Sequence, residues 1–173
     1  PPSPSWTKEE TMAYWINAYN AFTVDLILQH YPVKSILDID KGKLWDDAFI
    51  KIGENRFTLN NIENDILRKQ YSDARIHFAI NCASKSCPKL LNEAYTAEKL
   101  DEQLNAQAKN FVNDPSRNEI GVGKVSVSKI FDWYKEDFSK GGGVIEFLNQ
   151  FSNTRIQSTA AISYLGYDWT LNE

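Results

Sequence analysis

Apolar side chains between Lys8 and Gln29 recur at every third or fourth position, which is the spacing of one face of an α-helix. One stripe consists of Met12, Trp15, Ile16, Tyr19, Phe22 and Leu26. A second stripe consists of Ala13, Asn17, Asn20 and Val24. Thr7 and Glu10 have the spacing of a capping box at the helix start, and Pro32 follows its end. The pattern predicts a long, central and largely buried helix that ends near Gln29.

The rest of the chain mixes short strands and helices without the regular rhythm of a parallel α/β sheet. Apolar runs broken by turn residues predict hairpins at 47–58 and 120–127, a strand at 75–81, and one or two strands at 162–171. Helical spacing predicts helices at 61–70, 97–112, 128–138 and 144–151. These elements predict an α+β fold with a small, mainly antiparallel sheet. We expect residues 1–5 to form a flexible leader and residues 6–173 a single compact domain.

Composition narrows the possible classes of function. Of the 173 residues, 42% are apolar and 13% aromatic, which is typical of a packed globular protein. The net charge of −4 argues against nucleic acid as a partner. We expect no membrane insertion, because no run approaches the roughly 20 apolar residues of a spanning helix. We recognise no cofactor motif and no metal site, and we expect a small-molecule or peptide-like partner.

The segment around His77 carries the candidate chemistry. In an extended strand, side chains alternate between the two faces. Phe78, Ile80 and Cys82 would therefore face the core, and Cys82 would start out buried. Cys87 follows in a polar loop beside Lys85, whose positive charge favours a thiolate. A loop that folds back would bring the Cys87 sulfur to the His77 imidazole.

These residues suggest a Cys–His pair for nucleophilic catalysis. Cys87 would be the nucleophile, His77 the base and Glu63 the group that orients the imidazole. Asn81 would donate a hydrogen bond to the developing oxyanion. We assign three further residues of the same segment to substrate binding. They are Cys82, Lys85 and Ser86.

Each of these residues also has a purely structural interpretation. His77 would then bond a backbone carbonyl, and Glu63 would complete a capping box with Asn60. Cys82 and Cys87 would form a disulfide, which in so small a loop stabilises by about 2 kcal/mol. Zinc ligation by His77 and the two cysteines is a weaker alternative, because the spacing lacks a C-x2-C pattern and a fourth ligand.

Asn17 and Asn20 are three positions apart on one side of the first helix. Buried amides need hydrogen-bond partners. The two side chains therefore either hold the backbone of a neighbouring loop or line a polar pocket beside the His77 segment. The second arrangement would make a ligand-binding site without turnover.

Five blocks of the sequence, in order, resemble the family called domain of unknown function 547. The blocks are 14–21, 58–68, 75–88, 128–134 and 167–172. The resemblance runs from about Trp6 to the C-terminal end. Glu63, His77, Asn81 and Cys87 stand at positions typical of the family, and Asn64 stands where relatives often have His.

The resemblance implies a family widespread in bacteria, often in envelope or secreted proteins, and attached to coiled-coil segments in plants. We therefore expect an extracytoplasmic location. By analogy, the Glu, His and Cys set resembles that of papain-like and transglutaminase-like thiol hydrolases, although the chain order differs. The sequence predicts a thiol-dependent hydrolase or acyl transferase for an amide- or peptide-like substrate. The alternative is a non-catalytic binding or protein-interaction domain with structural cysteines.

Overall fold

The computed structural model describes residues 2–173, so Pro1 of the expected leader lies outside the described residues. Helix α1 (Lys8–His30) begins at the predicted capping box. The Thr7 hydroxyl accepts a hydrogen bond from the Glu10 amide, and the Glu10 carboxylate accepts one from the Thr7 amide. The first predicted stripe is largely buried, but Val24 of the second stripe is exposed. The helix is therefore central on one side and open to solvent on the other.

Four elements follow α1 before the segment of His77. They are the 3-10 helix η1 (Ile36–Asp46), the hairpin strands β1 (Ile50–Ile52) and β2 (Asn55–Phe57), and the π-helix η2 (Asn61–Tyr71). The hairpin and η2 were predicted, whereas η1 was not. The predicted capping box of Asn60 and Glu63 at the start of η2 was wrong. Thr58 and Asn61 exchange the capping hydrogen bonds, and Asn60 has helical backbone angles and no capping bond.

The predicted strand at 75–81 is instead a 3-10 helix, η3 (Ala74–Phe78), followed by irregular chain. The Asp73 carboxylate caps it by accepting a hydrogen bond from the Arg75 amide. The segment from Ile76 to Asn81 is buried on all sides, between α2 and η2. A continuous buried run lacks the periodicity that separates a strand from a helix. The expected alternation of His77 and Phe78 between two faces therefore does not apply.

The second half of the chain begins with η4 (Ala97–Lys99) and α2 (Leu100–Val112). Strands β3 (Glu119–Ile120) and β4 (Lys124–Val127) pair antiparallel, and β5 (Ala161–Tyr164) pairs parallel to β4. The predicted helix at 128–138 is two short helices, α3 (Ile130–Trp133) and α4 (Lys135–Ser139), separated at Tyr134. Helix α5 (Val144–Phe151) was predicted.

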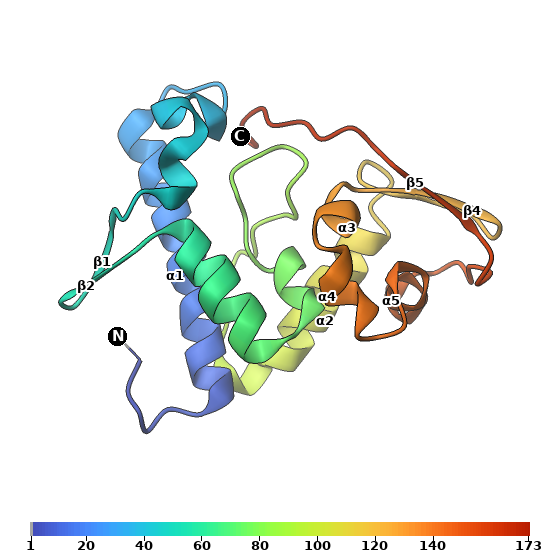
Figure 1. Cartoon of the computed structure of the whole chain (residues 1–173), viewed down its shortest axis with the longest axis horizontal. Helices are drawn as coiled ribbons and strands as arrows, with labels where there is room; N and C mark the ends of the chain where they lie inside the picture. Colours follow the sequence, from blue (N-terminus) through green and yellow to red (C-terminus); the bar gives the residue numbers. More distant parts are fainter. Residues whose placement is uncertain (1) are drawn as a thin grey trace.

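This arrangement is an α+β fold with a two-stranded and a three-stranded sheet. Three clusters of buried side chains form its core: one around α1 and η2, one around α2 and α3 to α5, and one around η1 and the end of α1. In Figure 1 the loop after η3 lies between α1 and α3, and the C-terminal segment runs along its upper end. Within residues 2–173, no helix is long and apolar enough to cross a membrane.

Candidate functional site

His77 lies in η3 and is 3% exposed. Its Nε2 atom is 2.7 Å from Oδ2 of Asp137. An ionised carboxylate only accepts hydrogen bonds, so Nε2 carries the proton and donates it. The imidazole also stacks on the ring of Tyr134, with 4.0 Å between the ring centroids. Asp137, and not Glu63 as predicted, therefore holds the orientation of the His77 ring.

Asp137 belongs to α4 and is held from a second side by Arg68 of η2. The guanidinium binds it through two nitrogens, with Nε 2.6 Å from Oδ2 and Nη2 3.1 Å from Oδ1. Burial by itself would raise the pKa of Asp137, but hydrogen bonds from His77 and Arg68 outweigh it and hold this pKa below its usual range. The carboxylate is therefore ionised at neutral pH. The three side chains form one polar network.

Glu63 lies in η2 and is 6% exposed. Its Oε1 atom accepts a hydrogen bond from the Tyr134 hydroxyl at 2.5 Å, and Oε2 accepts one from the Tyr19 hydroxyl at 3.3 Å. Burial and the nearby Glu63 charge raise the pKa of both tyrosines. Both phenols are therefore neutral donors. Glu63 is bound by the side chains of two distant elements instead of capping its own helix.

The two cysteines form a disulfide, with 6.3 Å between their Cα atoms. Cys87 is 4% exposed and Cys82 is half-buried, which reverses the predicted burial. The reason is that the preceding segment is not a strand, so Cys82 does not share a core-facing side with Phe78. The loop is also covered by the C-terminal segment, whose Leu171 pairs with Ser84.

Tyr167 joins the C-terminal segment to the disulfide. Its hydroxyl is 3.4 Å from each sulfur and accepts a hydrogen bond from the Ser84 hydroxyl at 3.0 Å. Burial raises the pKa of Tyr167 to about 12, although the hydrogen bond from Ser84 lowers it. Tyr167 is therefore a neutral phenol at physiological pH.

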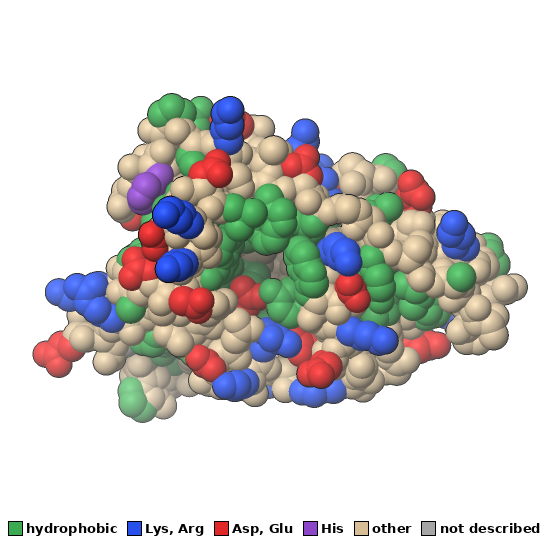
Figure 2. Space-filling view, turned by 45° about the horizontal axis from the view of Figure 1, so that its top comes forward, with side chains coloured by type: hydrophobic (Ala, Val, Ile, Leu, Met, Phe, Trp, Pro, Cys, Tyr) green, Lys and Arg blue, Asp and Glu red, His purple; other side chains and the backbone are tan. Residues whose placement is uncertain are grey.

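His77, Glu63, Tyr167 and the disulfide line one cavity of about 80 Å³, where the three core clusters meet. Its polar lining is Glu63, His77, Tyr19, Tyr134 and Tyr167, and its other walls are Trp45, Trp133, Trp169, Ile80, Ile130, Pro88, Cys82 and Cys87. Trp133 is 46% exposed, so the cavity has an aromatic wall that reaches the surface. Figure 2 shows a hollow near the middle of one face, surrounded by hydrophobic side chains.

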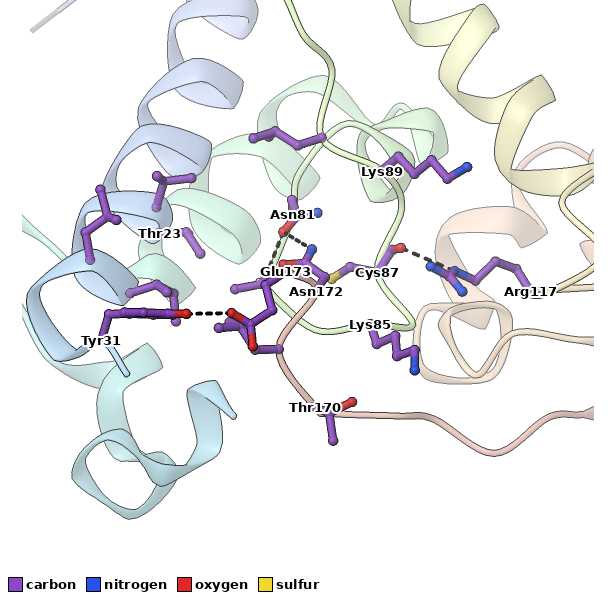
Figure 3. Close-up of a pocket in the computed structure, with 16 residues that line it drawn as sticks. Thr23, Tyr31, Asn81, Lys85, Cys87, Lys89, Arg117, Thr170, Asn172 and Glu173 are labelled. Carbon is purple, nitrogen blue, oxygen red and sulfur yellow. Dashed lines mark hydrogen bonds between the residues drawn. The ribbon is translucent and has the colours of Figure 1, made fainter. Parts of the chain in front are cut away.

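A larger hollow of about 620 Å³ lies on another side of the disulfide loop. Figure 3 shows Lys85, Lys89 and Arg117 along one part of it and the hydrogen-bonded pair Tyr31 and Glu173 along another. Cys87 lines both hollows. His77 and Glu63 line the smaller one alone, so the candidate chemistry lies there and not in the larger space.

The two asparagines of α1 hold backbone segments, as one of the two interpretations predicted. The Asn17 amide exchanges hydrogen bonds with the backbone of Tyr95. The Asn20 amide donates to the Ala79 carbonyl and accepts from the amide of Asn81. Asn20 thereby ties α1 to the start of the disulfide loop.

The remaining predicted site residues shape the same loop. The Asn81 side chain donates to the Pro88 carbonyl and accepts from the Ala83 amide. Ser86 accepts from the Asp168 amide, and Lys85 is exposed. Asn81, Lys85 and Ser86 do not line the smaller cavity. The structure thus brings Cys82, Cys87, His77 and Glu63 together and leaves the other three outside.

The sequence did not identify Asp137, Arg68 or the aromatic side chains of the cavity as site residues. Four of these aromatic residues, Trp133, Tyr134, Tyr167 and Trp169, lie in the last two family-like blocks, and this position could have identified them. Asp137 belongs to no recognisable motif. Asn64 accepts a hydrogen bond from Arg68, so it supports the network without lining the cavity. In the part of the chain that the structure describes, no cluster of three or more His, Cys, Asp or Glu side chains is placed to hold a metal ion.

Comparisons with known proteins give one match. The model of the family described as protein of unknown function, DUF547, matches residues 3–112. The match includes Glu63, His77 and both cysteines, whereas Tyr134, Asp137 and Tyr167 lie beyond it. No curated protein matches the chain, and no solved structure does. Because the matched segment is more than half of the sequence, the chain belongs to the DUF547 family of proteins of unknown function.

Proposed function

We propose that this protein is a binding domain that receives part of a small or peptide-like ligand in the cavity of His77 and Glu63, and that its cysteines are structural. The observation that carries the proposal is the convergence of buried polar side chains on one aromatic-walled hollow. Ligand sites typically combine an apolar lining with a few fixed polar groups. Here Asp137 fixes the imidazole, and two tyrosines fix the Glu63 carboxylate.

The size of the cavity limits what enters it. Pockets that enclose a whole small molecule usually measure about 300–1,000 Å³. A space of about 80 Å³ therefore takes one group of a few heavy atoms, and the rest of the ligand lies outside. The exposed edge of Trp133 offers a surface for that remainder.

A fragment screen by ligand-detected nuclear magnetic resonance tests the binding proposal. We expect hits whose binding weakens at least tenfold in Trp133→Ala and is unchanged in Trp6→Ala. Both tryptophans are substantially exposed, at 46% and 39%, but Trp6 is not part of the cavity lining. Hits that bind both variants equally, or the absence of any hit, would count against the proposal.

A second candidate function is the thiol-dependent hydrolase or acyl transferase, acting in the dithiol form. The observation that favours it is that both sulfurs line the cavity of His77. When the imidazole is neutral and donates through Nε2 to Asp137, Nδ1 is the basic nitrogen. The disulfide form offers no nucleophile, so this candidate needs a dithiol reductant.

Alkylation of the reduced protein separates the two candidates. The enzyme proposal expects Cys87 to react with iodoacetamide faster than Cys82, with a rate that rises through a pKa below that of an ordinary thiol. In His77→Ala the rate of Cys87 should fall to that of an ordinary thiol. If the alkylation rate of Cys87 is the same in His77→Ala and in the wild type, the result favours the binding proposal.

The disulfide also bears on where the protein works. Stable disulfides are typical of proteins in oxidising compartments. Cys82 and Cys87 are paired, which supports the proposal of an extracytoplasmic location. Intact-mass measurement of the protein isolated from its natural compartment, with thiols blocked at lysis, tests this: a free-thiol form would contradict it.

A further inference from the structure

We infer that the cavity of Glu63 and the three tryptophans recognises a methylated ammonium group, such as a quaternary ammonium head. This inference rests on the proposed binding function and names the chemical class of the ligand. Two independent features of the lining carry it. One is a buried carboxylate without a cationic partner, and the other is the aromatic wall.

The charge of the lining favours a cation. Glu63 lines the cavity, and no Lys, Arg or other acidic residue does. Within residues 2–173, Glu63 forms no ion pair, because its oxygens meet the hydroxyls of Tyr134 and Tyr19. Arg68 lies against the Tyr134 ring and attracts Glu63 at longer range, but its ion pair is with Asp137. A buried carboxylate without a direct ion pair attracts a cation in a site of low polarity.

The aromatic wall favours the same class of ligand. Trp169 is the centre of this wall, with its ring centroid 5.8 Å from that of Trp133, 6.0 Å from Trp45 and 4.6 Å from Tyr167. The face of an aromatic ring carries partial negative charge and attracts cations, most strongly in Trp. A carboxylate and several aromatic rings that line one cavity are the combination that binds quaternary ammonium groups.

The aromatic share of the lining favours a methylated over a primary ammonium. A primary ammonium has three N–H donors and needs three acceptors when it is buried. Here each carboxylate oxygen already accepts from one tyrosine, and the three tryptophans offer no acceptor of their own, so a primary ammonium depends on the remaining lone pairs of Glu63, the tyrosine oxygens and His77. A quaternary ammonium has no N–H donor, so its burial leaves no hydrogen bond unmade. Its volume of a few heavy atoms also suits a space of about 80 Å³.

Calorimetric titration of the whole chain with three small probes tests the inference. The probes are choline, its neutral isostere 3,3-dimethyl-1-butanol, and the primary amine ethanolamine. We expect choline to bind at least tenfold more tightly than either of the others. Glu63→Gln should remove most of the preference for choline over the isostere, because it removes the charge and keeps the shape.

The outcomes separate this inference from the binding proposal. Equal binding of choline and the neutral isostere would overturn the ammonium inference and leave an apolar binding site in place. If neither choline nor the isostere binds but the fragment screen gives hits, the ammonium inference is overturned and the binding proposal stands. If Glu63→Gln fails to fold, Trp133→Ala provides the test, because it removes an exposed ring of the wall. It should weaken choline binding at least fivefold, whereas Trp6→Ala should not change it.

Discussion

At the level of single residues, the polar groups of this site depend on partners that are distant in the sequence. His77 meets Asp137, which is 60 positions later, and Glu63 meets Tyr134, which is 71 positions later. The sequence identified Glu63 and His77 as candidate site residues, but it predicted that Glu63 orients the His77 imidazole. Sequence spacing does not show which of the acidic residues a fold brings to an imidazole, so Asp137 could not be predicted.

The lowered pKa of Asp137 has a consequence for stability at acid pH. A carboxyl whose folded-state pKa is depressed stabilises the fold above its unfolded pKa of about 3.9, and this contribution is lost as the pH falls below that value. We expect Asp137→Asn to lower the free energy of unfolding by about 2 kcal/mol at pH 7. The difference between this variant and the wild type should begin to shrink below about pH 5 and should keep falling below about pH 4, as the pH approaches the lowered folded-state pKa.

Urea denaturation across this pH range measures the effect. Asp38→Asn is a suitable control, because the exposed Asp38 side chain makes no ion pair or hydrogen bond among the residues described. It should change the stability by less than about 0.5 kcal/mol. A gap between Asp137→Asn and the wild type that stays constant with pH would show that the carboxylate is not held by His77 and Arg68.

At the level of elements, the amphipathic segments were predictable and the fully buried ones were not. The stripe of α1 and its capping box at Thr7 carry a clear helical signal, and the predicted helix matches α1. The segment of η3 is apolar and buried throughout, so it gave no period to decide between strand and helix. The break between α3 and α4 at Tyr134 has no Gly or Pro to mark it. That break nevertheless places the Tyr134 hydroxyl against Glu63.

The start of η2 gives a prediction at this scale. Thr58→Ala should lower the free energy of unfolding by about 1 kcal/mol, because it removes the hydroxyl that accepts from the Asn61 amide. Asn60→Ala should cost less than about 0.5 kcal/mol, because Asn60 has no capping hydrogen bond and its contacts are near the surface. Chemical denaturation of the two variants is the measurement. A larger loss of stability in Asn60→Ala than in Thr58→Ala would instead support the capping box predicted from the sequence.

At the level of the whole molecule, the site lies where three core clusters meet. The α+β class followed from the order of the elements, and the disulfide was one of three uses foreseen for the cysteines, beside catalysis and zinc ligation. The meeting of Trp45, Trp133 and Trp169 follows only from how η1, α3 and the C-terminal segment pack. No local pattern in the sequence encodes that junction, because each tryptophan belongs to a different element.

The disulfide closes a small loop and should contribute modestly to global stability. On the chain-entropy model, a sequence separation of five corresponds to about 2 kcal/mol. Complete reduction should therefore lower Tm by about 6 °C in a domain of this size. Thermal unfolding with and without a dithiol reductant measures this, and the double variant Cys82→Ser, Cys87→Ser should not respond to the reductant. An unchanged Tm after complete reduction, verified by intact mass, would contradict a structural role.

The most direct test of the binding site uses the five tryptophan indoles, because three line the cavity and two do not. Each indole N–H gives its own nuclear magnetic resonance signal, and single Trp→Phe variants assign them. On titration with choline, we expect saturable shifts at Trp45, Trp133 and Trp169 and none at Trp6 or Trp15. Shifts centred on Trp6 or Trp15, or no saturable shift at any of the five, would contradict the binding of a methylated ammonium group at the cavity of His77 and Glu63.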